Sequence, residues 1–310
     1  LLNERGLYAE SLPALDFTKT GANSEPDMQH IQLHLQPLLD KYMDADIFVT
    51  QGFICRNSTG EIDNLQRGGS DYTASLIGAA IEADEIEIWT DIDGMHNNDP
   101  RFVEKTDPVS ELHYEEAAEL AYFGAKILHP TCVLPAKVNN IPVRLLNTMD
   151  PDAHGTLIYN NISDPSIKAV AAKDNVVAIK IKSSRMLLAY GFLTKVFETF
   201  EKYKTPIDMI ATSEVGVSLT IDSERFLPEI ADELQKFGTV TIDKDMVIVC
   251  VVGNMEWTNT GYEARAVEAL ADIPVRMISY GGSNYNISFL IRKEDKIKAL
   301  NRLSERLFND

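Results

Sequence analysis

One short run in this 310-residue chain combines a guanidinium, two adjacent glycines, a hydroxyl and a carboxylate. The run is Arg67-Gly68-Gly69-Ser70-Asp71, and the small, apolar residues that follow it predict a helix over residues 69–82. Adjacent glycines let the backbone approach a ligand, and the N–H groups at a helix N-terminus attract anions. Arg67 offers a rigid fork suited to a carboxylate, and Asp71 can cap the helix or anchor a catalytic cation. An ordinary capped turn fits the pattern equally well.

A second polar run begins where a predicted strand, residues 85–90, ends. It starts with Thr90 and Asp91 and continues through a stretch rich in Asp, Asn and Gly to Arg101. Ligands of open α/β sheets bind beyond the carboxyl ends of strands, where Asp91 can accept from a ribose or base and Arg101 can meet a phosphate. The same composition is also typical of plain turns.

A third run, Phe-Gly-Ala-Lys ending at Lys126, places a cation next to the end of a predicted helix. Lys126 is a candidate phosphate ligand there. A single lysine at such a position is more often a solvated side chain.

The elements that must position these runs alternate between strand and helix as far as residue 158. Strands are predicted over residues 45–52, 85–90 and 142–146, and helices over residues 69–82, 114–125 and 130–139. This alternation predicts an α/β layer structure with a mostly parallel sheet.

After a polar stretch at residues 159–165, the chain contains an internal repeat with a period of about 70 residues. Each copy has the order strand, helix, two strands, helix. The first copy closes with its own last strand, residues 239–243, whereas the second ends on the helix of residues 294–308. An apolar strand at residues 167–172 stands ahead of the first copy. We infer that it completes the second copy, so that the first βαββαβ unit is inserted in the second.

Composition excludes several classes of function. The formal net charge is −18 with no block of Lys and Arg, which disfavours nucleic-acid binding. The longest apolar run is too short to span a bilayer, and the three separated cysteines predict neither a disulfide framework nor a metal site. These features fit a cytoplasmic protein. His30 and His34 share a helix face, but no third ligand is placed with them, so no metal site is predicted.

Together, the three runs resemble those of aspartate kinases, which carry Arg-Gly-Gly-Ser-Asp-Tyr, Trp-Thr-Asp…Asp-Pro-Arg and Phe-Gly-Ala-Lys…His-Pro segments in this order and at this spacing. The repeat resembles the paired ACT domains of that family. The resemblance implies part of an amino-acid kinase domain over residues 1–160. It also implies a first ACT domain at residues 176–244 and a second formed by residues 165–175 and 245–310.

The resemblance implies phosphoryl transfer from ATP, with Mg²⁺, to the side-chain carboxylate of L-aspartate, the first step of lysine, threonine and methionine biosynthesis. Arg67 and Asp71 then have catalytic roles, and Arg67, Gly68, Gly69 and Ser70 bind aspartate. Thr90, Asp91, His96, Arg101 and Lys126 bind the nucleotide. A carboxylate is already an ionised nucleophile, so the reaction needs alignment and cations more than a strong base.

The sequence departs from the family pattern in ways that bear on activity. Family members begin with a Lys-Phe-Gly-Gly segment and carry a Gly-Glu pair, and neither is present. We therefore expect that the chain lacks the first part of the kinase domain and is inactive alone. Its first residues, Leu1 to Gly6, are typical of a last helical turn with a glycine C-cap. His96 stands where a Tyr often packs near adenine, and Gln66 replaces a common Gly.

The first repeat carries a candidate effector site. Backbone N–H groups around Gly191 can hold a carboxylate, while Asp208 and Glu214 can hold an ammonium group, which together match an amino acid. The segment resembles the effector site of lysine-inhibited aspartate kinases, which implies L-lysine as effector. The candidate residues are Met186, Gly191, Phe192, Leu193, Ile207, Asp208, Thr212, Ser213 and Glu214. The second repeat has no acids at the equivalent place, and we expect it mainly to build a homodimer through the ACT domains.

Two alternatives remain open on the sequence. One is a non-catalytic amino-acid-binding module with a partial kinase domain as its scaffold. The other is a different amino-acid kinase, such as one acting on acetylglutamate, although the tandem ACT unit and the Trp89-Thr90-Asp91 loop disfavour it.

Overall fold

The computed structural model describes residues 1–66, 68–124, 130–160, 166–183 and 190–308. These residues form two compact units. The first comprises Leu1–Met95, Pro108–Tyr122 and Lys126–Ile162, and the second comprises His96–Asp107, Phe123–Ala125 and Ser163–Asp310. The loop that carries Arg101 therefore belongs to the same compact unit as the C-terminal half of the chain. The domain boundaries drawn from the sequence stay a prediction.

The first unit opens with a crossover between parallel strands. Strand β1 (Ala9–Leu12) pairs parallel with β2 (Ile47–Thr50), and α1 (Met28–Lys41) connects them. The chain begins with a 3-10 turn over Asn3–Arg5 that ends at Gly6 in the left-handed conformation, as its sequence predicts. A hairpin of β3 (Ile54–Arg56) and β4 (Ile62–Asn64) follows.

Helix α2 (Gly69–Ala80) leads into a four-stranded sheet with the order β5-β7-β8-β6. Its strands are β5 (Ile86–Thr90), β6 (Glu111–His113), β7 (Val143–Asn147) and β8 (Thr156–Tyr159), and its helices are α3 (Tyr114–Phe123) and α4 (Pro130–Asn139). Strands β5 and β7 run parallel, as do β6 and β8, while β7 and β8 are antiparallel. The α/β class with mostly parallel pairing is confirmed, and each predicted strand and helix of this half is present within a few residues.

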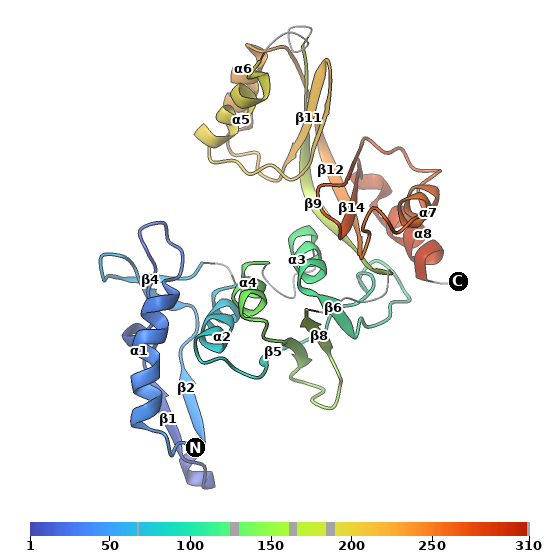
Figure 1. The fold of residues 1–310 in the computed structure, drawn as a ribbon. Helices are drawn as coiled ribbons and strands as arrows, with labels where there is room; N and C mark the ends of the chain where they lie inside the picture. Colours follow the sequence, from blue (N-terminus) through green and yellow to red (C-terminus); the bar gives the residue numbers. More distant parts are fainter. Residues whose placement is uncertain (67, 125–129, 161–165, 184–189, 309–310) are drawn as a thin grey trace. The chain divides into compact units, whose positions relative to one another are not determined.

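The second unit is built on one six-stranded antiparallel sheet with the order β10-β11-β9-β12-β14-β13. The strands are β9 (Ile167–Lys182), β10 (Ile210–Ser213), β11 (Gly216–Ile221), β12 (Thr239–Gly253), β13 (Met277–Tyr280) and β14 (Asn286–Arg292). The helices are α5 (Phe192–Lys202), α6 (Leu227–Gln235), α7 (Tyr262–Ala269) and α8 (Lys296–Phe308). The long strands β9 and β12 run side by side through the middle of the unit (Figure 1).

Each end of the long strands belongs to a different βαββαβ repeat. The second half of β9 pairs with β11, and the second half of β12 pairs with β14. The strand predicted at residues 167–172 is the first half of β9, and its Val170 packs in the core under α7 and α8. This pairing is the one that insertion of the first repeat into the second requires. The sequence did not reveal that residues 167–172 and the first strand of the first repeat form one continuous strand, β9, or that residues 239–243 are the start of the longer strand β12.

Two separate cores hold the repeats. The first contains Val196 and Phe200 of α5 and Ile230 of α6 against β9 and β11. The second contains Leu300, Leu303 and Leu307, which recur on one face of α8 at helical spacing and pack on β12 and β14. In the part of the chain that the structure describes, no helix has the length and apolar character needed to cross a bilayer.

Candidate functional site

The glycine-rich run forms the entry to α2, as the sequence predicts. Gly68 is the N-cap residue, with φ 71° in the left-handed region, and Asp71 lies in the first turn. Gly69 is buried, and a Cβ at this position would lie 2.7 Å from Cδ2 of Phe53. Glycine is therefore required here for close approach of the backbone, while Ser70 at the next position is exposed.

Neighbouring elements fix this helix entrance from two sides. The Sγ of Cys132 in α4 donates to the carbonyl of Gly68 at 3.4 Å, and Ser75 Oγ of α2 donates to the carbonyl of Cys132. On the other side, Thr73 Oγ1 donates to the carbonyl of Gly69 at 2.7 Å and accepts from the backbone N–H of Phe53 at 3.0 Å. The N–H groups of the first turn are held in place, which is the condition for an anion site at a helix N-terminus.

Gly52, just beyond β2, also lies at this entrance. A Cβ on Gly52 would lie 3.1 Å from Cα of Ser70 and 3.3 Å from its Oγ. The end of a parallel strand and the start of α2 thus meet at Ser70, which is where an α/β sheet places its ligands. Sequence reasoning did not assign Gly52 to the site, although a glycine at the end of a predicted strand is the available signal.

Thr90 and Asp91 lie at the carboxyl end of β5, as predicted from the sequence. Thr90 is paired with Asn147 of the parallel neighbour β7, and its carbonyl accepts from the backbone N–H of Thr148 at 2.8 Å. Thr90 Oγ1 donates to Asp91 Oδ1 at 3.1 Å, and Asp91 is exposed. An exposed carboxylate at a strand end can accept from a ribose hydroxyl or a base amine.

His96 and Arg101 belong to the second unit. His96 Nδ1 lies 3.0 Å from Thr106 Oγ1. Arg101 forms a forked ion pair with Asp99, donating through Nε at 2.9 Å and through Nη2 at 2.6 Å. Burial raises the pKa of Asp99, but the hydrogen bonds and charge of Arg101 outweigh it and hold the pKa below the ordinary value for this carboxyl.

Three candidate residues, Arg67, Lys126 and Met186, lie outside the described residues. Thr90 and Asp91 belong to one unit, and His96 and Arg101 to the other. That these four side chains share a single nucleotide site stays a prediction.

The candidate effector segment, residues 207–214, contains β10, which forms an edge hairpin of the six-stranded sheet with β11. Thr212 and Ser213 end β10, and Glu214 stands in the turn that leads to β11, with all three side chains exposed. Gly191 caps α5 with φ 78°, Phe192 is buried in the core below it and Leu193 is 37% exposed. The exposed acid and hydroxyls are thus accessible to a ligand, and their role in binding it stays a prediction.

Asp208 has a partner that the sequence did not reveal. Its side chain is 1% exposed, and Oδ1 lies 2.7 Å from Nζ of Lys173, which also lies 2.9 Å from Oδ2 of Asp222. Ile207, next to it, packs against the core of the first repeat. An ammonium group of a ligand would have to compete with Lys173 for this carboxylate. Lys173 and Asp208 are 35 positions apart, so only the pairing of strands brings them together.

The histidine pair of α1 and the three cysteines form no metal-binding group among the described residues. His30 and His34 stack on α1 with ring centroids 3.8 Å apart, and no group of three His, Cys, Asp or Glu residues arranged for a metal occurs among the described residues. All three cysteines are buried.

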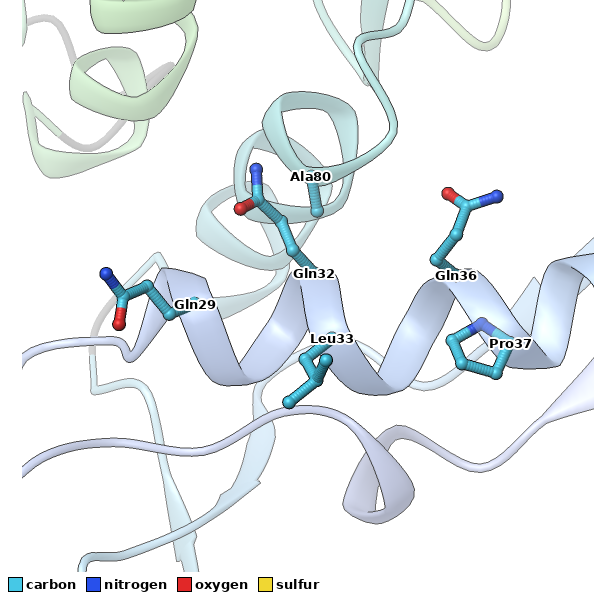
Figure 2. A pocket seen from close by; sticks show the side chains of 6 residues that line it. All are labelled: Gln29, Gln32, Leu33, Gln36, Pro37 and Ala80. Carbon is cyan, nitrogen blue, oxygen red and sulfur yellow. The ribbon is translucent and has the colours of Figure 1, made fainter.

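A hollow of about 550 Å³ lies between α1 and α2. Figure 2 shows its lining side chains, all of which are uncharged. They are Gln29, Gln32, Leu33, Gln36, Pro37 and Ala80. Such a lining has no cation for a phosphate or carboxylate, so the hollow is not the site described above.

Family models match both halves of the chain. Residues 1–147 match the amino acid kinase family, and residues 249–307 match an ACT domain. The lysine-sensitive aspartokinase 3 of Escherichia coli is 34% identical, over 99% of this chain and 71% of the relative. Aspartokinase 1 of Arabidopsis thaliana, a chloroplastic enzyme, is 37% identical over 87% of this chain, which spans 50% of that relative.

Solved structures match the fold over nearly the whole chain. E. coli aspartokinase III in complex with aspartate and ADP superimposes with a TM-score of 0.87, at 34% identity, over 99% of this chain and 71% of that one. The aspartate kinase of Clostridium acetobutylicum gives a TM-score of 0.85 at 28% identity, over 96% and 70% of the two chains. At this identity and coverage, the chain that carries the glycine-rich helix entrance, the strand-end Thr90-Asp91 pair and the two ACT-like repeats belongs to the aspartokinase family.

Proposed function

We propose that the protein transfers the γ-phosphoryl group of ATP to the side-chain carboxylate of L-aspartate, and that L-lysine regulates it through the ACT repeats. The observation that carries the proposal is that the first unit contains a helix N-terminus and a strand end that can each bind a substrate. Ser70 and Asp71 lie at the N-terminus of α2, and Thr90 and Asp91 lie at the carboxyl end of β5. The E. coli relative has been solved with aspartate and ADP, and also with lysine and aspartate.

Each end suits one substrate by its chemistry. The N–H groups at the entrance of α2 favour a carboxylate, so this end would hold L-aspartate. Asp91 would accept a hydrogen bond from the ribose or base of ATP. Arg101 would bind the phosphates of ATP once its ion pair with Asp99 breaks. Mg²⁺ would arrive on the phosphates, since it binds through substrate oxygens and water with only one or two protein carboxylates. The protein's work is then alignment and neutralisation of charge, which phosphoryl transfer mainly requires.

Nucleotide binding by the chain itself tests the first part. We expect Mg-ADP to bind in calorimetric titrations, and Asp91→Ala to weaken binding roughly tenfold because a hydrogen-bonded carboxylate is lost. Asp84→Ala, which removes an exposed acid ahead of the same strand, is the matched control and should bind as the wild type does. A chain that binds L-lysine but no nucleotide would favour the regulatory-module alternative.

Activity requires a test in which the whole kinase domain is present. We would join the chain to the amino-terminal part of the E. coli relative that precedes the aligned region and follow aspartate-dependent release of ADP. The fusion should be active, the chain alone inactive, and Asp71→Asn in the fusion should lower kcat about 100-fold because a group that orients the reacting centre is lost. A fusion whose activity ignores Asp71→Asn contradicts the catalytic assignment of that residue.

The effector assignment has its own test. L-lysine should raise the melting temperature of the chain, and Glu214→Ala should abolish the rise because it removes an exposed carboxylate that faces the ligand ammonium group. L-threonine serves as the control ligand. We also propose a homodimer through the ACT repeats, built mainly by the second repeat, whose edge strand β13 pairs with a second copy. Sedimentation at varied concentration distinguishes the dimer from a monomer.

A further inference from the structure

The loop that carries Arg101 is built into the C-terminal repeat. Asn98 Nδ2 donates to the carbonyl of Leu300 in α8 at 3.2 Å, and both residues are buried. Asn301 Nδ2, one residue further along α8, donates to the carbonyl of Phe102 at 3.5 Å. Val103 is 4% exposed and belongs to the same hydrophobic core as α7 and α8. A loop of the kinase-like sequence is thus held by α8 at two points, Asn98 and Phe102.

A nearly buried lysine lies at the centre of this contact. Lys296, the first residue of α8, has a side chain only 9% exposed, and its Nζ lies 4.0 Å from the ring centroid of Phe102. The same Nζ pairs with Oδ2 of Asp174 in β9 at 2.7 Å. A charge removed from water must be paired to be tolerated, and here the cation faces a ring on one side and a carboxylate on the other. Phe102 directly follows Arg101, and Arg101 Cζ lies 5.7 Å from the centroid of the same ring, so Lys296 and the Arg101 guanidinium share one aromatic neighbour.

Lys173, the residue before Asp174 in β9, connects this strand to the candidate effector segment. Lys173 pairs with Asp208, which lies within that segment, while Asp174 pairs with Lys296. The two residues sit where β9 is irregular, because Asn175 has φ 61° and the register with β12 shifts at this level. Only the peptide unit between Lys173 and Asp174 therefore separates the ion pair of Asp208 from that of Lys296. This peptide unit lies where the hydrogen-bond ladder between β9 and β12 is interrupted.

We propose that Lys296 is a positioning residue for Arg101 and that the Lys173-Asp174 pair carries the state of the effector segment to it. The proposal rests on the proposed function, because it assigns a nucleotide role to Arg101. An amino acid whose ammonium group competes with Lys173 for Asp208 shifts Lys173, and with it the neighbouring Asp174 and its partner Lys296. The loop that carries Arg101 then loses the contact between Lys296 and Phe102. Coupling of this kind is reciprocal, so bound nucleotide weakens the effector by the same factor.

The positioning role is tested with Lys296→Met, which keeps an apolar stem and removes the charge. We expect Mg-ADP to bind roughly 5- to 10-fold more weakly, within the usual range for coupled sites. Lys296→Arg should restore most of the affinity, because it restores the cation over Phe102. Lys298→Met is the matched control, since Lys298 is half exposed on the same helix and pairs with Asp272. It should bind Mg-ADP as the wild type does.

Hydrogen exchange gives a readout that does not depend on nucleotide. In Lys296→Met, peptides covering residues 97–103 should exchange faster than in the wild type, while peptides from α5 are unchanged. If exchange in this loop is the same in both proteins, the inference is wrong whatever the nucleotide does. If the wild type itself binds no Mg-ADP, the nucleotide assignment of the proposed function fails, and exchange alone decides the anchoring.

The connection to the effector segment is tested with Asp174→Asn, a change of charge at nearly constant size on a side chain 41% exposed. In the wild type, saturating L-lysine should weaken Mg-ADP binding several-fold. In Asp174→Asn this factor should fall close to one, with the affinity for L-lysine itself retained. A variant that keeps the full lysine effect on Mg-ADP overturns this part of the proposal.

Discussion

At the scale of single residues, Gly69 shows how tightly the entrance of α2 is packed. A Cβ there would approach not only the ring of Phe53 at 2.7 Å but also Cβ of Leu65 at 3.2 Å and Cα of Phe53 at 3.3 Å. Because backbone and core atoms cannot all move aside, the methyl group of an alanine would push the helix entrance away from β3.

We therefore expect Gly69→Ala to lower the free energy of unfolding by about 1 to 3 kcal/mol, as overpacked cores do. Urea denaturation measures the change. Gly282→Ala is the control, since a Cβ on Gly282 meets no atom within 4 Å. Equal stability of Gly69→Ala and the wild type would show that the entrance can relax and that the packing argument is wrong.

Residues also mark what the sequence could and could not predict about the site. The local features of Gly68, Asp71 and Asp91 were predictable, because helix entrances and strand ends follow from short-range patterns. The pairing of Asp208 with Lys173 was not, because it depends on which strands become neighbours. The anchoring of the loop at Phe102 was not predictable either. Two apolar residues after Asp-Pro-Arg indicate burial, but not the partner against which they are buried.

At the scale of elements, α1 carries one histidine, His30, that makes stability depend on pH. Burial lowers the pKa of His30 below its ordinary 6.5, and the nearby charges of His34 and Lys19 act in the same direction. The unfolded chain therefore takes up a proton at His30 more readily than the folded chain does. Stability is lost as the pH falls through 6.5, with the neutral ring favoured in the fold.

His30→Gln should reduce this loss. We expect the variant to lose less stability than the wild type between about pH 7.5 and about pH 5.5, measured by urea denaturation at both values. His154→Gln, on an exposed side chain of the turn before β8, is the comparison variant and should keep the wild-type dependence. A His30→Gln protein with the full acid sensitivity would place the responsible group elsewhere.

The elements themselves were largely predictable, with one instructive exception. Helix α4 begins and ends where its sequence predicts, and β5 starts within one residue of the predicted position. The exception is β9, which a polar Lys-Asp-Asn stretch divides in the sequence and which the structure shows as one strand. Strand pairing with β12 holds both halves in line, so tertiary contacts override the local turn signal.

At the scale of the whole molecule, two units with separate hydrophobic cores need not unfold together. Leu12, Phe17 and Leu35 belong to a core of the first unit, whereas the effector segment lies entirely in the second. A ligand that binds only the folded second unit stabilises that unit alone, by about 2.7 kcal/mol at 100 times its dissociation constant.

Calorimetry should accordingly show two transitions, of which L-lysine raises only one. Glu214→Ala should abolish the shift without altering either transition in the absence of ligand, because Glu214 is exposed. Limited proteolysis identifies which unit each transition belongs to. A lysine effect of equal size on both transitions would contradict confinement of the effector site to the second unit.

The contact between α8 and the Arg101 loop also has a consequence for how the protein is made. Asn98 and its partner Leu300 are 202 positions apart. At roughly 5 to 20 residues per second, a ribosome needs about 10 to 40 seconds to pass from one to the other. During that time the loop has left the ribosome without its partner helix. The loop that we assign to the nucleotide is thus anchored only after α8 is translated, and a polypeptide released earlier carries this loop without its anchor.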